Sequence, residues 1–223
     1  MPNIRIFTPS FRPDPSVIYA LSGLKSAQAV DAMDRKGGMN GSIHAIWCGQ
    51  PVVGTALTVQ AAPHDVLAIY AALAVSQPGD IIIASTNAYQ GSAVLGGVMA
   101  GFMLNAGVVA FVTDGLVRDA DELGQKKFPV FAAGLSPNAP QKDGPGTVGE
   151  QIIVGGAIIN CGDVIVADRD GVAVIPRDRA EAVAEKIPTI LQREIDFELM
   201  HKQGLKAPSW LESFMTSERV INQ

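Results

Sequence analysis

The residues of this 223-residue chain that are best suited to chemistry lie between positions 95 and 122, in the sequence LGGVMAGFMLNAGVVAFVTDGLVRDADE. A glycine pair, Gly96-Gly97, opens a run with helical character. A helix start without bulky side chains exposes backbone N–H groups that attract a carboxylate or phosphate. Further along, Arg118 offers a planar fork for a carboxylate, and Asp119 offers an oxygen to a hard cation. The pattern predicts a site for an anionic substrate held beside a metal.

Two predicted elements must bring these residues together: a helix that is ended by Gly107 and a short apolar strand over 108–112. Ligands of open α/β sheets bind beyond the carboxyl ends of strands, so we expect the glycine pair and the Arg118-Asp119 turn to face one pocket. The polar loop 85–92 follows another apolar strand and is expected to line the same pocket. The alternative interpretation is structural: a glycine pair is often only a turn, and an Arg-Asp pair is often solvated.

The composition of the chain excludes several classes of protein. Its length fits one large domain or two small ones, and 48% hydrophobic residues are enough for a core. A formal charge of −5 argues against a nucleic-acid footprint but leaves protein partners open. Cys48 and Cys161 are too few for a disulfide framework and are expected as buried thiols in a reducing cytoplasm. No signal peptide and no membrane-spanning run are recognisable, so we expect a cytoplasmic protein.

The rest of the chain predicts helices alternating with strands up to about residue 132, and mainly strands after it, following a proline-rich extended arm at 1–15. Expected helices cover 17–24, 27–33, 66–75 and 179–187, with caps at Ser16, Ser26, Asp65 and Asp178 and a separate helix over 189–203 after a break at Pro188. Expected strands cover 43–48, 53–60, 81–84, 128–132, 150–154, 157–160, 164–167 and 172–175. The unbroken isoleucines at 81–83 indicate burial on both faces, and the loop 136–147 is expected to be a lid or a subunit contact.

Other chemistries have little support in the sequence. The three histidines do not cluster, and no nucleophile elbow, P-loop or dinucleotide fingerprint follows a strand. Asp168 and Asp170 are interpreted as turn residues, and the similar segments GDIIIA and GDVIVA as a shared way of turning into a strand. Carboxylates gather only at Asp114, Asp119, Asp121 and Glu122. One such carboxylate plus waters suits Mg²⁺, and such a cation stabilises a developing enolate.

The segment Gly96-Gly97-Val98-Met99, followed by VTDGLVRD at 112–119, resembles the RraA-like family. This family includes 4-hydroxy-4-methyl-2-oxoglutarate/4-carboxy-4-hydroxy-2-oxoadipate aldolases and regulators of RNase E activity. The likeness runs from about residue 16 to 186. The family pattern G-x20-R-D-x2-E/D, which marks members able to bind metal and cleave 2-oxo acids, is met by Gly97, Arg118, Asp119 and Glu122.

The resemblance implies a fold, an assembly and residue roles. The fold is an α/β/α sandwich with a central mixed sheet, of the phosphohistidine-domain-like swivelling type, and the assembly is a homotrimer or homohexamer with active sites between subunits. Asp119 would bind Mg²⁺ or Mn²⁺ mostly through waters, and Arg118 would bind the substrate carboxylate or 2-oxo oxygen. The backbone of Gly96, Gly97, Val98 and Met99 would hold a pyruvate-like carboxylate. A glutamate from a neighbour's C-terminal helix, Glu194 or Glu198 here, would assist.

Together these patterns predict a divalent-metal-dependent lyase that cleaves a 2-oxo acid to pyruvate, a class II aldolase with oxaloacetate decarboxylase side activity. Residues 1–187 are expected to form one domain, and 188–223 a helical tail that packs on a neighbouring subunit. Expected partners are the small 2-oxo acid and copies of the chain, without nucleic acid or membrane. The alternatives are a non-catalytic protein that binds and regulates a ribonuclease, and a related lyase or hydratase that acts on a sugar acid or on a product of aromatic breakdown.

Overall fold

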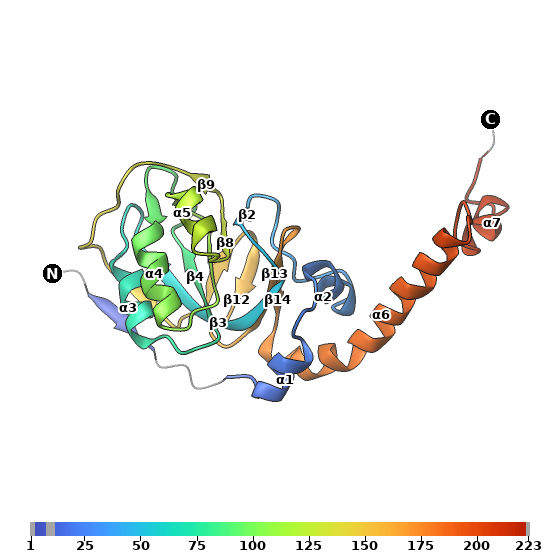
Figure 1. Ribbon diagram of the computed structural model, residues 1–223, viewed down its shortest axis with the longest axis horizontal. Coiled ribbons are helices and arrows are strands. Elements are labelled where there is room, and N and C mark those ends of the chain that lie inside the picture. The colour runs from blue at the N-terminus through green and yellow to red at the C-terminus, as the bar shows by residue number, and fades with distance from the viewer. Residues whose placement is uncertain (1–2, 8–11, 222–223) are drawn as a thin grey trace.

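The structure, a computed structural model, describes residues 3–7 and 12–221 and is built around a nine-stranded mixed sheet (Figure 1). The strand order is β1-β10-β3-β4-β6-β8-β2, and the hairpin β13–β14 joins through β3. The four central strands β3, β4, β6 and β8 run parallel, whereas β10, β13 and β2 run antiparallel to them. The strands are β1 (Ile4–Ile6), β2 (His44–Trp47), β3 (Val52–Ala61), β4 (Asp80–Ser85), β6 (Ala110–Thr113), β8 (Val130–Ala132), β10 (Gly146–Val148), β13 (Val164–Asp168) and β14 (Gly171–Ile175).

Strand β4 lies at the centre of the hydrophobic core. Ile81, Ile82 and Ile83 are fully buried, and Ile82 belongs to a different apolar cluster from its two neighbours. Because successive side chains of a strand point to opposite faces, this arrangement buries both faces of the sheet. The expected two-sided burial of this strand is confirmed.

Helices cover the sheet on one side, and further strands and helices complete the other. The helices α3 (Leu67–Val75), α4 (Gly97–Asn105) and α5 (Ala120–Gln125) contribute side chains to the cluster that contains Ile82. The hairpin β11 (Ile152–Val154) and β12 (Ala157–Ile159) packs into the opposite cluster. Against β13–β14 lie α1 (Pro15–Ala20), α2 (Ser26–Ala32) and the start of α6 (Ala180–Lys202). The expected α/β/α sandwich with a central mixed sheet is therefore confirmed.

A second, three-stranded parallel sheet was not expected. It consists of β5 (Ala93–Leu95), β7 (Leu116–Val117) and β9 (Gly134–Leu135), in the order β5-β7-β9. Strand β7 lies between the expected strand over 108–112 and the Arg118-Asp119 turn, where the sequence predicts no strand. Leu116 and Val117 are buried, which explains why this segment forms a strand instead.

The N-terminal predictions need three corrections. Part of the expected extended arm is strand β1, which pairs with β10, while 1–2 and 8–11 lie outside the described residues. Helix α1 begins at Pro15 and is capped by Asp14, which accepts hydrogen bonds from the backbone N–H and hydroxyl of Ser16. Ser26 does not cap α2, because its N–H and hydroxyl donate to Asp168 at 2.7 Å each. Asp168 thus ties α2 to β13 and is more than a turn residue.

The predicted break at Pro188 is wrong. Helix α6 runs without interruption from Ala180 to Lys202, through Pro188 and across the expected boundary between 187 and 188. Its first turns are buried against the body, whereas the residues from 191 to 199 are all exposed. Figure 1 shows α6 projecting from the body, after the short 3-10 turn η1 (Arg177–Arg179), with α7 (Trp210–Met215) at its far end. In the described part of the chain, no helix combines the length and hydrophobicity that crossing a membrane requires.

The segments GDIIIA and GDVIVA share the turn that the sequence suggests. Gly79 and Gly162 both have positive φ angles, and the aspartate after each accepts a hydrogen bond from the backbone N–H three residues earlier. The first aspartate, Asp80, is fully buried and pairs through both carboxylate oxygens with Arg12, at 2.5 and 3.1 Å. These hydrogen bonds raise the pKa of Arg12. The pair anchors the N-terminal segment at the start of β4.

Replacing Asp80 by alanine should lower the free energy of unfolding by about 3 kcal/mol, because it leaves the Arg12 guanidinium without its buried partner. The matched control is Glu150→Ala, which removes a more exposed ion pair of the same N-terminal segment, with Arg5 at 3.9 Å. Glu150→Ala should lower the free energy of unfolding by less than about 1 kcal/mol. Urea unfolding measures both values, and equal losses would contradict the assigned role of Asp80.

Candidate functional site

The candidate site lies at the carboxyl ends of the second sheet. Strand β5 leads into Gly96-Gly97, and β7 leads into Arg118-Asp119. The backbone N–H of Arg118 donates to the carbonyl oxygen of Leu95 at 2.9 Å, which holds these two strand ends together. The rule that ligands bind beyond strand ends therefore applies to a sheet that the sequence analysis did not anticipate.

Asp119, which follows β7, caps the N-terminus of α4. Its Oδ2 atom accepts a hydrogen bond from the backbone N–H of Gly97 at 3.0 Å. The N-cap residue Gly96 supplies no side-chain acceptor, so the carboxylate of Asp119 takes that place at the positive end of the helix. The N–H groups of Val98 and Met99 lie in the first turn and have no acceptor within the helix. They are available to a ligand anion, whereas that of Gly97 is already used.

The backbone of Asp119 is in the left-handed region, with φ 59° and ψ 40°. Aspartate tolerates this conformation better than most residues. Its carboxylate lies beside the guanidinium of Arg118, with Nε and Oδ2 3.5 Å apart, and both side chains are about two-fifths exposed, at 41% and 38%. In the described part of the chain, the Oδ1 atom of Asp119 and the terminal nitrogens of Arg118 have no hydrogen-bond or ion-pair partner. A ligand can therefore bind these atoms without displacing a partner from the described part of the chain.

The spacing of the family pattern corresponds to direct contact in space. A Cβ atom at Gly96 would lie 2.5 Å from Oδ2 of Asp119 and 3.0 Å from Nε of Arg118. A Cβ atom at Gly97 would overlap the carboxylate of Glu122, which also pairs with Lys126 at 3.2 Å. The two glycines are therefore the positions that let the acidic side chains approach the helix start.

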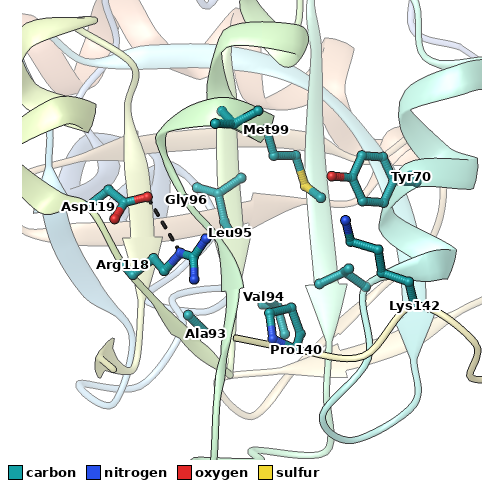
Figure 2. A pocket seen from close by; sticks show the side chains of 12 residues that line it. Tyr70, Ala93, Val94, Leu95, Gly96, Met99, Arg118, Asp119, Pro140 and Lys142 are labelled. Atoms are coloured by element: carbon teal, nitrogen blue, oxygen red, sulfur yellow. Dashed lines mark ion pairs between the residues drawn. The ribbon is translucent and has the colours of Figure 1, made fainter. Parts of the chain in front are cut away.

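A pocket of about 90 Å³ opens on this arrangement, and Figure 2 shows the side chains around it. Arg118 and Asp119 lie on one side, and Tyr70 and Lys142 lie on the other. Its lining residues are Val66, Tyr70, Ala93, Val94, Leu95, Gly96, Val98, Met99, Arg118, Asp119, Pro140 and Lys142. A second recess on Arg118 and Asp119 is lined by Ala120, Leu135, Ser136 and Pro137. The Arg118-Asp119 pair thus borders two hollows.

Sequence reasoning missed Tyr70 and Lys142. Tyr70 belongs to α3, and Lys142 to the loop 136–147, and nothing in their local patterns places them beside Arg118. The Lys142 ammonium lies over the Tyr70 ring, 5.5 Å from its centroid. Pro140 and Lys142 bring this loop to the pocket, which the sequence does not predict, and its interpretation as a lid or a subunit contact stays a prediction.

Two predicted contributions to the site are wrong. Asp114 is buried away from Asp119, and its carboxylate accepts four hydrogen bonds from Ser85, Thr86 and Ala88. It therefore shapes the loop 85–92 and does not join a carboxylate cluster. That loop does not line the pocket, because β5, which follows it, occupies the position.

The remaining candidates lie elsewhere within this single chain. Glu194 accepts a hydrogen bond from Gln28 at 2.7 Å, and Glu198 pairs with Lys202 on the projecting part of α6. His64 has its Nδ1 atom 2.7 Å from the Ser92 hydroxyl. Cys161 is buried and Cys48 is half-buried, and burial raises the pKa of both thiols. None of these residues lines the pocket described above.

The donor set fits a hard divalent cation with a mostly aqueous shell. Among residues 3–7 and 12–221, no group of three or more His, Cys, Asp or Glu side chains is placed to hold a metal. Mg²⁺ commonly binds one or two carboxylates and keeps several waters, so Asp119 with its open Oδ1 atom meets that requirement. Glu122 is the other carboxylate close to the start of α4.

Gly96→Ala should displace Asp119 and weaken binding of Mg²⁺, because the new methyl group would take the space of the Asp119 carboxylate. The measurement is the rise in unfolding temperature on adding MgCl₂, which follows the affinity of the folded state. Gly101→Ala is the matched control, because a Cβ atom there meets nothing closer than 4.0 Å. A Mg²⁺-dependent rise in Gly96→Ala equal to that of the control would contradict this reading of the glycine.

Comparisons with known proteins show which family this chain resembles in sequence and in structure. A "Putative 4-hydroxy-4-methyl-2-oxoglutarate aldolase" of Halalkalibacterium halodurans is 36% identical over 156 residues, covering 70% of this chain and 74% of that protein. The crystal structure of RraAS2 from Streptomyces coelicolor, titled an unusual member of the RNase ES inhibitor RraA protein family, has a TM-score of 0.76 at 26% identity. It covers 86% of this chain and all of that one.

An uncharacterised protein from Pseudomonas syringae has a similar crystal structure, with a TM-score of 0.75 at 27% identity, covering 89% of this chain and 96% of that one. The family model described as RraA-like, Aldolase/RraA, matches residues 26–174 and so contains the whole pocket. It ends before η1, α6 and α7. The chain therefore belongs to the RraA-like (Aldolase/RraA) family.

Proposed function

We propose that this protein is a divalent-metal-dependent lyase that cleaves a 2-oxo acid to pyruvate. The observation that carries the proposal is the Arg118-Asp119 pair at the start of α4, with an open carboxylate oxygen beside an open guanidinium. The relative from Halalkalibacterium halodurans, whose name specifies an aldolase for 4-hydroxy-4-methyl-2-oxoglutarate, supports this class of substrate. Mg²⁺ or Mn²⁺ is the proposed cofactor, and Asp119 its protein ligand.

The chain's own residues would bind and orient the substrate. The N–H groups of Val98 and Met99 would receive the carboxylate next to the keto group, at the positive end of α4. Arg118 would donate to the keto oxygen and stabilise the negative charge that develops there. When bound, the divalent cation would add Lewis-acid polarisation of the same keto group.

The proposed reaction is a retro-aldol cleavage. The bond between C3 and C4 of the substrate breaks as the C4 hydroxyl loses its proton to a base. The electron pair moves into the 2-oxo acid fragment, which is then protonated at C3 to give pyruvate. With oxaloacetate the same fragment would arise by loss of CO₂. We propose that the base or acid is water or a glutamate of a neighbouring α6, Glu194 or Glu198.

The pocket also suggests how the remote end of the substrate is held. Lys142 supplies a second cationic group, on the side of the pocket opposite Arg118 (Figure 2). A 2-oxo acid with a second carboxylate would therefore meet a positive group at each end. Val66, Val94 and Met99 add apolar surface to the same pocket.

We further propose that the chain assembles as a homotrimer or homohexamer in which the projecting α6 and α7 pack on a neighbouring copy. Leu191, Ile195 and Leu199 are spaced four residues apart on α6 and are 39%, 52% and 50% exposed. Residues at this spacing share one face of a helix, so they form an apolar stripe. On α7, Trp210 packs edge to face on Phe214 and is 59% exposed.

The second candidate function is a non-catalytic protein that regulates a ribonuclease by binding it. The observation that favours it is the likeness to RraAS2, whose title names a family of RNase ES inhibitors. This function requires no metal and does not use the open oxygen of Asp119. It predicts a stable protein complex and no pyruvate release.

Asp119→Ala should reduce Mg²⁺-dependent pyruvate release to the level measured with EDTA, and Arg118→Ala should reduce it by about 100-fold or more. The assay couples pyruvate to lactate dehydrogenase, with oxaloacetate and 4-hydroxy-4-methyl-2-oxoglutarate as substrates. Asp121→Ala is the control, because this exposed carboxylate of α5 does not line the pocket. Undiminished release by Asp119→Ala would refute the proposal.

Ile195→Glu should reduce the mass of the assembly, because it places a charge in the apolar stripe of α6. Light scattering after size-exclusion chromatography should give the wild-type protein a mass of three or six chains of 23.4 kDa. Gln192→Glu adds the same side chain to an exposed position of the same helix and should leave the mass unchanged. A monomeric wild-type protein, or equal masses for wild type and Ile195→Glu, would contradict the assignment.

A further inference from the structure

We propose that Tyr70 is a positioning residue, whose aromatic ring holds the Lys142 ammonium at the mouth of the pocket and so favours 2-oxo acids that carry a second carboxylate. The inference rests on the proposed function, because it concerns the substrate class of the same pocket. Tyr70 would act through Lys142 and needs no direct contact with the reacting atoms.

The first observation is the geometry of the pair. The Lys142 nitrogen lies 5.5 Å from the centroid of the Tyr70 ring, within the range of a cation–π contact. Tyr70 is half-buried in α3, and both side chains line the pocket. Figure 2 shows them together on the side opposite Arg118 and Asp119. The ring thus attracts the ammonium toward the pocket, although Lys142 as a whole is an exposed residue.

The second observation is that the backbone on both sides of Lys142 is fixed to the segment before α3. The backbone N–H of Gln141 donates to the His64 carbonyl oxygen at 2.7 Å, and the carbonyl oxygen of Gln141 accepts from Val66 at 3.1 Å. On the other side, the backbone N–H groups of Asp143 and Gly144 donate to Asp65, at 2.8 and 2.7 Å.

Asp65 is itself buried and also accepts from the backbone of Leu67, in the first turn of α3. The sequence predicts Asp65 as the cap of a helix that begins at Val66, whereas in the structure the N-cap is Val66 itself and Asp65 precedes it. Because Asp65 anchors both the loop and the helix, it fixes the Lys142 backbone relative to the Tyr70 ring. Only the four-carbon side chain of the lysine remains to be ordered.

The third observation is the charge around the pair. Within residues 3–7 and 12–221, no carboxylate lies within 4.0 Å of the Lys142 nitrogen. The aromatic ring is therefore the group that orders the ammonium, and its charge is not already neutralised by an ion pair. Beside one open carboxylate, that of Asp119, the pocket presents two cationic groups, those of Arg118 and Lys142. This balance suits a ligand with two anionic ends.

The experiment measures calorimetric affinities for pyruvate and for 2-oxoglutarate, a probe with a second carboxylate, in the presence of MgCl₂. Lys142→Gln should weaken binding of 2-oxoglutarate about tenfold, the loss expected for a hydrogen bond to a charged group. Tyr70→Leu should weaken it about two- to fivefold, whereas Tyr70→Phe, which keeps the ring, should match the wild type. The loss should be larger for 2-oxoglutarate than for pyruvate, which lacks the second carboxylate, and measurable pyruvate binding also shows that each variant is folded.

The double variant separates positioning from a merely structural role. In a Lys142→Gln background, Tyr70→Leu should cause no further loss of 2-oxoglutarate affinity, because the ring then has no ammonium to hold. Additive losses, or a Tyr70→Phe variant as weak as Tyr70→Leu, would overturn the inference about Tyr70. Normal pyruvate binding and release with such a result would leave the proposed lyase intact. If the wild type binds neither acid and releases no pyruvate, both proposals fail.

Discussion

The site depends on one interaction, the hydrogen bond from the Gly97 N–H to the Asp119 carboxylate. It joins the start of α4 to the end of β7 and occupies the positive end of the helix with a side chain from another segment. The contact requires that Gly96 and Gly97 have no Cβ atoms, because one would meet Asp119 and the other Glu122. The residues of the family pattern G-x20-R-D-x2-E/D are thus the residues that pack together at the start of α4.

The same interaction determines what remains free for a ligand. One oxygen of Asp119 is used by the helix, and the other is open. The Nε atom of Arg118 lies 3.5 Å from Oδ2 of Asp119, the oxygen that accepts from the helix. The terminal nitrogens of Arg118 have no partner among the described residues. The open oxygen and the terminal nitrogens support the proposal that a cation and an anionic substrate bind side by side while the ion pair between Arg118 and Asp119 stays in place. Lys142 and Tyr70 extend this arrangement across the pocket.

The sequence predicts the elements that have a long hydrophobic signal or a distinctive spacing. The buried β4 with Ile81–Ile83 and the pairing of Gly96-Gly97 with Arg118-Asp119 both follow from such signals. The strands β5, β7 and β9 have only two or three residues each, too few for a periodic pattern. Asp114 is adjacent to the site in sequence, but its carboxylate satisfies the backbone of the loop 85–92. Tyr70 comes from α3, and only the tertiary packing brings it to the pocket.

The most direct test of the central claim is the binding of Mn²⁺, followed by the electron paramagnetic resonance signal of the free ion. The account predicts about one bound Mn²⁺ per chain in the wild type, held mostly through waters, and loss of that binding in Asp119→Asn. Asp121→Asn, an exposed neighbour on α5, should bind Mn²⁺ as the wild type does. Equal Mn²⁺ binding by Asp119→Asn and the wild type would show that the open oxygen of Asp119 is not the metal ligand, and the account would be wrong.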